Sequence, residues 1–312
     1  MLQKEITTDP KEINAVDSQG IMTPEHLQPI DHNEITNDTV DITSKPSKES
    51  FFAYTWRTVS ELRYVKFALA SFVVNNLRRR YQRSVLGFAW SLLNPLLMMI
   101  VLTAVFSIIF QRDPKTFGVF VFTGLLPWTF ISESIATGCG SITSAESFMK
   151  KVYIPKIFFP LVTVSTELIN FGLSLISMVG LAVLLGLKLH WTLLLLPIAM
   201  GITFLFTFGI ALAMAVSTVY FRDIAHLTRV VLSCFFYLIP VVYPLSAVPS
   251  KYKVCFENNP FTFFINLFRE IIYYGTVPTL KEWLIPSGFA VIALCIGFLI
   301  LRLKERDIIF RL

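Results

Sequence analysis

Charge is what this sequence of 312 residues has least of. Charged residues make up 15% of the chain and hydrophobic residues 54%, whereas a water-soluble domain carries about 25% charged residues. The mean hydropathy is +0.64, which agrees with this excess of apolar residues. The composition excludes an ordinary soluble domain and favours a chain that exposes much of its surface to lipid.

Motifs of enzymatic chemistry are missing as well. The sequence contains no glycine-rich phosphate loop ending in Gly-Lys-Ser or Gly-Lys-Thr, no nucleophile elbow and no His-Glu-x-x-His zinc motif. The four histidines are scattered, and the four cysteines lie far apart without paired spacing. We therefore expect a protein that is not an enzyme, with no catalytic residues, no metal and no cofactor of its own.

The first fifty residues differ from all that follows. They carry ten acidic residues and four lysines, a net charge of −6, whereas residues 51–312 carry 23 basic and 11 acidic residues, a net charge of +12. Residues 1–50 lack the apolar stretch of a signal peptide, and their Asp, Glu, Thr, Asn and Pro content predicts disorder. We expect an acidic, disordered tail followed by a basic membrane domain.

Six apolar stretches are long enough for helices that cross a bilayer, which needs roughly 20 residues. They cover about 86–110, 117–137, 166–187, 192–219, 228–246 and 284–301. Sixteen Lys and Arg residues flank these stretches on one side of the membrane and seven on the other. Since cytoplasmic loops are the more basic, both termini are predicted to be cytoplasmic. The predicted fold is an all-α integral membrane protein with six transmembrane helices in residues 85–312.

An arginine cluster lies directly before the first predicted span. Residues 60–84 repeat apolar residues at helical spacing, which predicts an amphipathic helix. We interpret 51–84 as an interface region whose basic face meets anionic headgroups, and the alternative is a helix packed on a soluble domain. An apolar run follows the arginines at once, which excludes a nucleic-acid patch. The apolar stripe consists of Leu62, Val65, Leu69, Phe72, Val73 and Leu77, and the cluster of Arg78, Arg79, Arg80 and Arg83.

Two further stretches do not fit plain spans. Residues 141–160 contain three lysines and two prolines, which predicts a short cytoplasmic helix and a broken approach to the membrane at Pro155 and Pro160. Residues 258–275 form an apolar helix too short to cross, so we expect an interfacial or re-entrant outer segment. Its start signal is Asn258-Asn259-Pro260 and its stop signal is Gly275.

Two acidic residues, Glu133 and Glu167, fall inside predicted spans. Ionisable groups inside a membrane are functional candidates, but we favour a polar contact between helices or a carboxylate at the membrane edge.

Aromatic residues gather toward the outer half of the predicted spans. They form either an interface belt or the lining of a conduit in which rings stack on sugar faces. The candidate conduit rings are Trp128, Phe130, Tyr237, Tyr243, Phe264 and Phe268.

Several longer stretches carry a resemblance to a known family. They occur in family order from about residue 62 to the C-terminus, and the tail lies outside them. The chain resembles the permease subunits of bacterial ABC exporters for polysaccharides, which serve O-antigens, capsules and wall teichoic acids. The stretches are "RRRYQRSVLGFAWSLLNPLL", "FVFTGLLPWTFISESI", "MKKVYIPKIFFPLVTV", "VYFRDIAHL", "PVVYPLSAVP" and "NNPFTFFINLFREIIYYG".

The resemblance implies a homodimer in the bacterial inner membrane that pairs with a dimer of a separate ATPase subunit, which binds ATP and Mg. The cargo it implies is a polysaccharide linked to undecaprenyl pyrophosphate, O-antigen first. It makes 66–84 the interface helix, 141–156 the coupling and gate helix, and 251–280 an outer gate. Membrane lipids are expected partners, and nucleic acid is not.

The resemblance also implies roles for single residues, although topology determination alone is the alternative for the basic ones. The residues implied to meet headgroups or form a gate are Arg78, Arg79, Arg80, Arg83, Lys150, Lys151 and Tyr153. Those implied to couple to the ATPase are Glu146, Arg222, Asp223 and His226.

Three other classes of protein are alternatives to a polysaccharide exporter. An ABC permease for drugs or other lipids would lack "GLLPWTF" and "KKVYIPK", which this chain has. A membrane glycosyltransferase or ligase would need acidic metal ligands, and the outer loops offer only isolated acidic residues. A structural scaffold fits the proline-broken gates poorly. The sequence does not specify which glycan is moved, or whether the ATPase carries a carbohydrate-binding domain.

Overall fold

The computed structural model describes residues 50–82, 86–87, 89–152, 154–184 and 190–311. These residues form helices joined by short connections, with no β-strand among them, and the predicted all-α class is confirmed. Of the features predicted from sequence, the acidic tail up to residue 49, Arg83 and Tyr153 lie outside the described residues. The principal helices are α1 (Phe51–Tyr64), α2 (Lys66–Tyr81), α3 (Ala89–Ile109), α4 (Pro114–Cys139), α5 (Glu146–Met149), α6 (Phe158–Leu184), α7 (Leu196–Tyr220), α8 (Asp223–Leu238), α9 (Ser250–Glu257), α10 (Pro260–Arg269) and α11 (Leu280–Arg311). Three 3-10 turns, η3 (Thr143–Ala145), η4 (Trp191–Leu195) and η5 (Leu245–Ala247), and a π-helical turn, η6 (Glu270–Tyr274), complete the described elements.

Four of the described helices are long and apolar enough to cross a membrane. They are α4, α6, α7 together with the preceding turn η4, and α11. The apolar part of α3 is shorter, Leu93–Ile109, and α8 has 16 residues. Six predicted spans therefore correspond to four helices of spanning length and two shorter ones.

Two predicted boundaries are wrong. Helix α6 begins at Phe158 rather than near 166, and Pro160 lies in its first turn. Proline is tolerated there because the first backbone N–H groups of a helix have no partner inside it. Helix α8 ends at Leu238, and Ile239 is extended with φ −110° and ψ 140°. Within the fifth predicted span, 228–246, residues 239–244 are therefore not helical.

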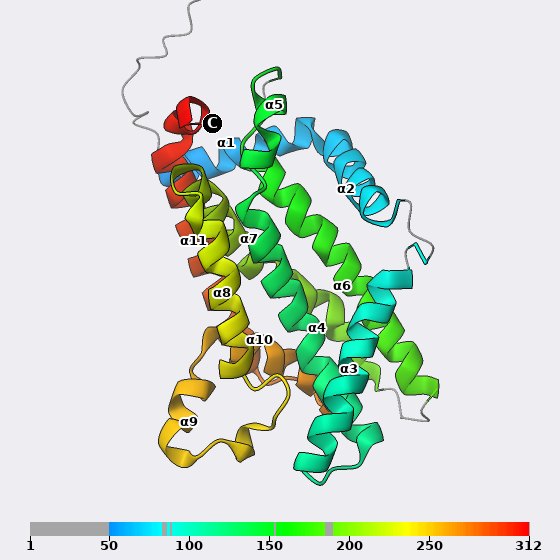
Figure 1. Ribbon diagram of the computed structural model, residues 1–312. Coiled ribbons are helices and arrows are strands. Elements are labelled where there is room, and N and C mark those ends of the chain that lie inside the picture. Colours follow the sequence, from blue (N-terminus) through cyan, green and yellow to red (C-terminus); the bar gives the residue numbers. More distant parts are fainter. Residues whose placement is uncertain (1–49, 83–85, 88, 153, 185–189, 312) are drawn as a thin grey trace, which may run out of the picture. The chain divides into compact units, whose positions relative to one another are not determined.

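Helix α4 is the central element of the described fold (Figure 1), and it contacts α3, α6, α7, α8 and α10. Its start follows directly from sequence. The Asp113 side chain accepts a hydrogen bond from the backbone N–H of Thr116 at 3.1 Å, and Pro114 occupies the first helical position. Because five helices surround α4, most of its residues are buried. Its few exposed residues are the ones that a ligand or a second chain can contact.

Helices α7 and α11 pack closely enough to require glycine. A Cβ atom on Gly209 would lie 2.4 Å from the carbonyl carbon of Ala293, and one on Gly297 would lie 2.5 Å from the Gly209 oxygen. Small residues let the backbones of membrane helices approach in this way. Gly209 and Gly297 therefore let the backbones of α7 and α11 pack directly against each other.

The interface region 51–84 contains two helices, because α1 ends before Val65 and α2 begins after it. The predicted apolar stripe is present but packs on protein. Val73 of α2 forms a buried cluster with Ala145, Phe158 and Phe159, and the other members of the stripe pack against this cluster. The stripe faces α6 and the turn before α5 rather than lipid, and a position in the membrane interface stays a prediction.

The two ends of the bundle carry different elements (Figure 1). Helices α1 and α5 and the C-terminal end of α11 lie at one end, and α9 and α10 lie at the other. The predicted helix signals of the second group are confirmed: Asn259 accepts from the N–H of Phe261 at 3.1 Å, and Gly275 ends the turn η6 with φ +67°. Helix α10, with 10 residues, is too short to cross a bilayer.

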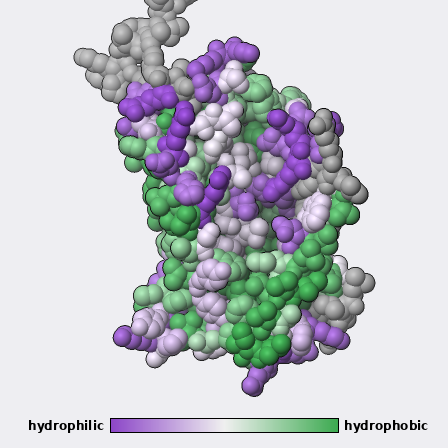
Figure 2. All heavy atoms as spheres, viewed as in Figure 1, coloured by the Kyte–Doolittle hydropathy of each residue, from purple (hydrophilic) through white to green (hydrophobic). Residues whose placement is uncertain are grey.

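Hydrophilic surface is unevenly distributed over the face shown in Figure 2. It gathers at the end that carries α1 and α5 and reaches into the middle of this face, where it gives way to weakly polar surface between two apolar flanks. The middle of this face corresponds to α4 and α8 in the same view. A polar line thus runs over helices that are otherwise apolar.

Candidate functional site

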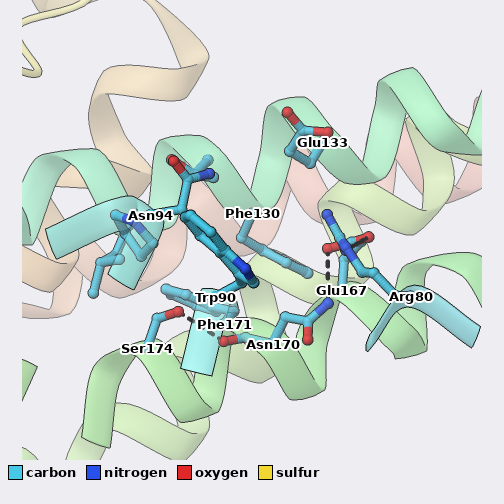
Figure 3. A pocket seen from close by; sticks show the side chains of 12 residues that line it. Arg80, Trp90, Asn94, Phe130, Glu133, Glu167, Asn170, Phe171 and Ser174 are labelled. Atoms are coloured by element: carbon cyan, nitrogen blue, oxygen red, sulfur yellow. Dashed lines mark hydrogen bonds and ion pairs between the residues drawn. The ribbon is translucent and has the colours of Figure 1, made fainter. Parts of the chain in front are cut away.

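A polar cavity of about 380 Å³ lies between α2, α3, α4 and α6 (Figure 3). The lining residues of α4 and α6 recur at three- and four-residue steps, so those of each helix lie on one face of it. Arg80 closes it from the last turn of α2. The lining from α4 is Leu126, Thr129, Phe130 and Glu133, that from α6 is Glu167, Asn170, Phe171 and Ser174, and that from α3 is Trp90, Asn94 and Pro95.

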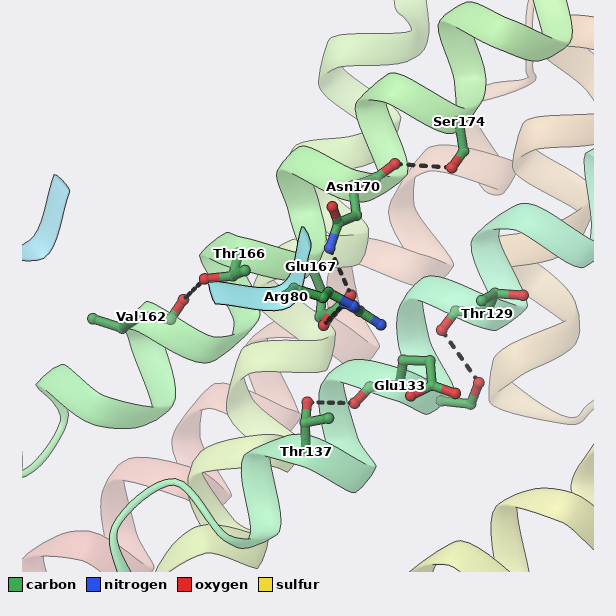
Figure 4. A network of polar contacts seen from close by, with 10 residues as sticks. Arg80, Thr129, Glu133, Thr137, Val162, Thr166, Glu167, Asn170 and Ser174 are labelled. Carbon is green, nitrogen blue, oxygen red and sulfur yellow. Dashed lines mark hydrogen bonds and ion pairs between the residues drawn. The ribbon is translucent and has the colours of Figure 1, made fainter. Parts of the chain in front are cut away.

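An ion pair closes one side of this cavity. Nη1 of Arg80 lies 2.6 Å from Oε1 of Glu167, and Nδ2 of Asn170 donates to Oε2 of Glu167 at 3.2 Å (Figures 3 and 4). The side chain of Glu167 is 12% exposed and that of Arg80 is 46% exposed. The predicted polar contact between helices is confirmed for Glu167. The carboxylate is held in place, whereas the guanidinium can reach solvent.

Glu133 lies across the cavity from Glu167 (Figure 3). It is exposed, and the described residues provide its carboxylate with no hydrogen bond or ion pair. Its backbone oxygen accepts from Thr137 at 2.6 Å within the same helix (Figure 4). A carboxylate on a helix of spanning length needs water, a polar ligand or another chain near it.

A second hollow, a groove of about 740 Å³, runs along the other side of α4 toward α8. Thr129 and Glu133 line both hollows, so the cavity and the groove meet on α4. The groove mixes hydroxyls and one guanidinium with aromatic and aliphatic side chains. Its lining is Met98, Leu125, Trp128, Thr129, Ser132, Glu133, Ala136, Thr137, Arg229, Leu232, Ser233, Phe236 and Tyr237.

A polar cluster joins three segments at the end of the bundle that carries α5. The Tyr54 hydroxyl donates to Oε2 of Glu305 at 2.7 Å, and Nζ of Lys156 lies 3.8 Å from Oε1 of the same carboxylate. Burial lowers the pKa of Lys156, an effect that the charge of Glu305 opposes. Burial raises the pKa of Tyr54, and its hydrogen bond to Glu305 raises it further. Glu305 thus ties α1 and the approach to α6 to α11.

The residues implied to meet headgroups or the ATPase lie mostly exposed. Arg78, Arg79 and Lys151 are exposed, and Nζ of Lys150 lies 2.5 Å from Oε1 of Glu146. Arg222, Asp223 and His226 are exposed at the start of α8. Among the members of this set that the structure describes, only Arg80 lines the cavity. The roles of all of them stay predictions.

The candidate conduit rings fall into two groups. Trp128, Phe130, Phe264 and Phe268 are buried in the core, where the ring of Phe130 stacks on that of Phe171 with centroids 5.0 Å apart. Tyr237 is 75% exposed and lines the groove. Tyr243 is half-buried, and its hydroxyl donates to the Tyr237 carbonyl at 2.8 Å. A conduit role stays a prediction, and Tyr237 has the most accessible ring for it.

The sequence reasoning missed Arg269, which it counted only as a basic residue of an outer loop. The side chain is 4% exposed at the end of α10. A clue was available, because Arg269 follows the apolar stripe of 261–268 at helical spacing and so falls on the buried side of a short helix.

Comparison with known proteins identifies the family of this chain. A family model described as ABC-2 type transporter matches residues 68–273. This chain belongs to the ABC-2 type transporter family. With its four helices of spanning length, this member of the family is a multi-pass integral membrane protein.

Several relatives of this ABC-2 transporter are named for the export or transport of polysaccharides. The O-antigen export system permease protein RfbA of Myxococcus xanthus is 32% identical over 240 residues, which cover 76% of this chain and 92% of the relative. A protein of the same name from Klebsiella pneumoniae is 28% identical over 65% of this chain and 78% of the relative. The polysialic acid transport protein KpsM of Escherichia coli is 21% identical over 77% of this chain and 94% of the relative. The family resemblance inferred from the sequence is confirmed.

Proposed function

We propose that this chain is the permease subunit of an ATP-driven exporter that moves a lipid-linked polysaccharide, O-antigen in first place, across the bacterial inner membrane. The names of the relatives from Myxococcus and Klebsiella support this cargo. One structural observation carries the proposal: the cavity and the groove meet at Thr129 and Glu133. Polar groups therefore follow a helix of spanning length, as a hydrophilic cargo requires.

The groove offers a sugar chain the contacts that lipid cannot. Hydroxyl groups deprived of water need hydrogen-bond partners, and Ser132, Glu133 and Thr137 supply such groups along α4. Aromatic rings pack well against the apolar faces of sugars, and Tyr237 presents its ring at the same groove. Hydroxyls and rings side by side suit a glycan better than an apolar drug.

A homodimer completes the path in this proposal. The groove is open along one side of the chain, so a second copy that faces α4 and α8 would close it. Each copy then contributes six membrane helices, with α3 and α8 beside the four of spanning length. Basic residues gather near α2, α5, the start of α8 and the C-terminus. They support a cytoplasmic position for the end of the bundle that carries α5 and for both termini.

The conformational change driven by ATP would begin at the end of the bundle where α5 and the first turn of α8 lie (Figure 1). A separate ATPase dimer binds ATP and Mg and docks there, on Glu146 and on Arg222, Asp223 and His226, which are exposed or half-buried. Glu305 bonds both to Tyr54 and to Lys156, and it transmits displacement of the segment after α5 to α1 and α11.

Arg80 supplies the first contact for the charged end of the cargo. A lipid diphosphate is an anion, and an arginine binds phosphate oxygens through several N–H donors. The guanidinium of Arg80 is partly exposed while bonded to Glu167. In this step the diphosphate displaces Glu167 from Arg80, after attraction by the exposed Arg78 and Arg79.

One experiment tests the proposal as a whole. The chain is purified with and without its cognate ATPase, both samples are reconstituted, and ATP hydrolysis is measured. In parallel the gene is deleted and surface O-antigen is followed by gel. We expect a stable complex with ATPase activity, and loss of O-antigen that plasmid-borne protein restores. Failure to form the complex excludes the exporter.

The second candidate is a capsule or teichoic-acid exporter, which the relative named for polysialic acid transport favours. In the same deletion strain, loss of an acidic capsule with intact O-antigen would select this candidate. A cargo of drugs or other lipids would leave both surface glycans unchanged.

A further inference from the structure

Arg269 is a buried cation without a carboxylate beside it. Its side chain is 4% exposed, and none of the ion pairs among the described residues includes it. Nη2 donates to the carbonyl oxygen of Val241 at 2.7 Å, and the guanidinium carbon lies 4.0 Å from the centroid of the Phe120 ring. Nε has no partner among the described residues. A charge in such a place is costly unless both of its contacts are kept.

Three segments meet at this guanidinium. Phe120 belongs to α4, Val241 to the non-helical segment after α8, and Arg269 to the last position of α10. Gly124 of α4 leaves the space for them. A Cβ atom on Gly124 would lie 2.7 Å from the Val241 oxygen and 2.9 Å from Nη2 of Arg269. The site therefore depends on the absence of a side chain at one position of α4.

The contacts of Arg269 tolerate less displacement than those of its apolar neighbours. Apolar contacts of α10, such as those of Phe264 and Phe268, survive small shifts because they are not directional. The Arg269 contacts do not, since a hydrogen bond weakens steeply when its geometry changes. Once α10 has moved away from α4, water replaces the lost partners and the charge is no longer buried. Such a residue favours either a closed or a fully opened state.

We propose that Arg269 locks the outer segment, formed by residues 239–244 and α10, onto α4, and that opening of the outer end of the path breaks its contacts with Val241 and Phe120. This inference rests on the proposed function and on the expectation that residues 251–280, which include α10, form an outer gate. Arg269 acts as a positioning residue, and it touches no cargo in the closed state.

Thiol labelling tests the lock. In a chain whose native cysteines are replaced by alanine, Val242→Cys places a reporter at a buried position beside Val241. The reporter is labelled in spheroplasts with a membrane-impermeant maleimide, without the ATPase. Arg269→Met removes the donor, and Gly124→Ala forces the three segments apart. Because a hydrogen bond from a charged donor corresponds to roughly a tenfold change in an equilibrium, we expect each variant to label about tenfold faster.

Matched controls separate a lock from general damage. Gly288→Ala adds a Cβ atom that meets nothing within 4 Å, and Arg112→Met removes an exposed arginine. Both should label like the parent. A merely structural Arg269 would lower the melting temperature in detergent and leave labelling in the cold unchanged.

A well-folded Arg269→Met chain that labels like the parent overturns the proposal. Should that variant fail to fold, equal labelling of Gly124→Ala and Gly288→Ala overturns it instead. Labelling needs neither ATP nor glycan, so this result is independent of the outcome of the export experiment.

Discussion

Single residues in this protein show two ways of keeping a charge inside a helix bundle. Glu167 has a charged partner in Arg80 and a neutral one in Asn170, so both of its oxygens are bonded. Arg269 has a carbonyl and a ring face instead of a carboxylate. The first arrangement allows an exchange of one anion for another, whereas the second resists movement until it breaks.

Charge exchange at Arg80 gives a prediction at this scale. Arg80→Met should reduce surface polysaccharide by about fivefold, since one basic charge near phosphate groups is worth roughly 1 kcal/mol. Glu167→Gln should retain export, because it releases the guanidinium and leaves a polar side chain beside Asn170. The measurement is surface O-antigen at equal amounts of membrane-inserted protein.

A double variant provides the control. Combining Arg80→Glu with Glu167→Arg restores an ion pair between α2 and α6 but moves the cation into α6. Export should stay low. Recovery to the level of the parent would mean that the pair only holds the two helices together, and it would rule out the exchange.

Among the helices, close packing of α7 and α11 depends on two glycines. Gly209→Ala places a Cβ atom against the backbone at Ala293, and overpacking of this kind costs about 1–3 kcal/mol. We expect a lower melting temperature and less monodisperse protein after solubilisation. Fluorescence-detected size exclusion over a temperature series measures both.

The same helix contains a matched position. A Cβ atom on Gly201 meets nothing within 4 Å, and alanine is a better helix former than glycine by about 1 kcal/mol. Gly201→Ala should therefore leave the melting temperature unchanged or raise it slightly. If both variants melt alike, close contact between α7 and α11 is not what limits stability.

Sequence patterns predicted most helices well, and local signals in the sequence account for the ends of several of them. Asn259, Pro260 and Gly275 around α10 act on the backbone next to them, so local rules located them. The end of α8 at Leu238 also has a local signal, because Pro240 disfavours the helical conformation of Ile239. The predicted span 228–246 followed the apolar residues past this proline and so ran too far. There the chain leaves the helix and packs Ile239, Val241 and Val242 as buried, non-helical residues.

At the scale of the whole molecule, the proposed path depends on the polar line of α4. Replacing Thr129, Ser132 and Thr137 together by leucine should stop export without unfolding the protein. Each of these hydroxyls donates only to a backbone carbonyl of its own helix, which the substitution leaves helical. We expect loss of surface polysaccharide with the ATPase complex intact, as measured by co-purification.

The control for this triple variant lies on α6. Ile169, Ile176 and Val183 are exposed apolar residues, and leucine at these three positions should change neither export nor assembly. Undiminished export by the α4 variant would show that the cargo does not pass along this groove.

The sequence by itself determined that this is a helical membrane protein with a charged end, because composition and periodicity act along the chain and need no knowledge of contacts. It also located Glu167 and Arg80 as unusual charges, but not as partners. Only the tertiary structure brought them together across 87 residues, joined Glu305 to Tyr54 and Lys156, and buried Arg269 above Gly124. These contacts depend on how helices distant in the chain pack against one another, and no local pattern encodes that arrangement.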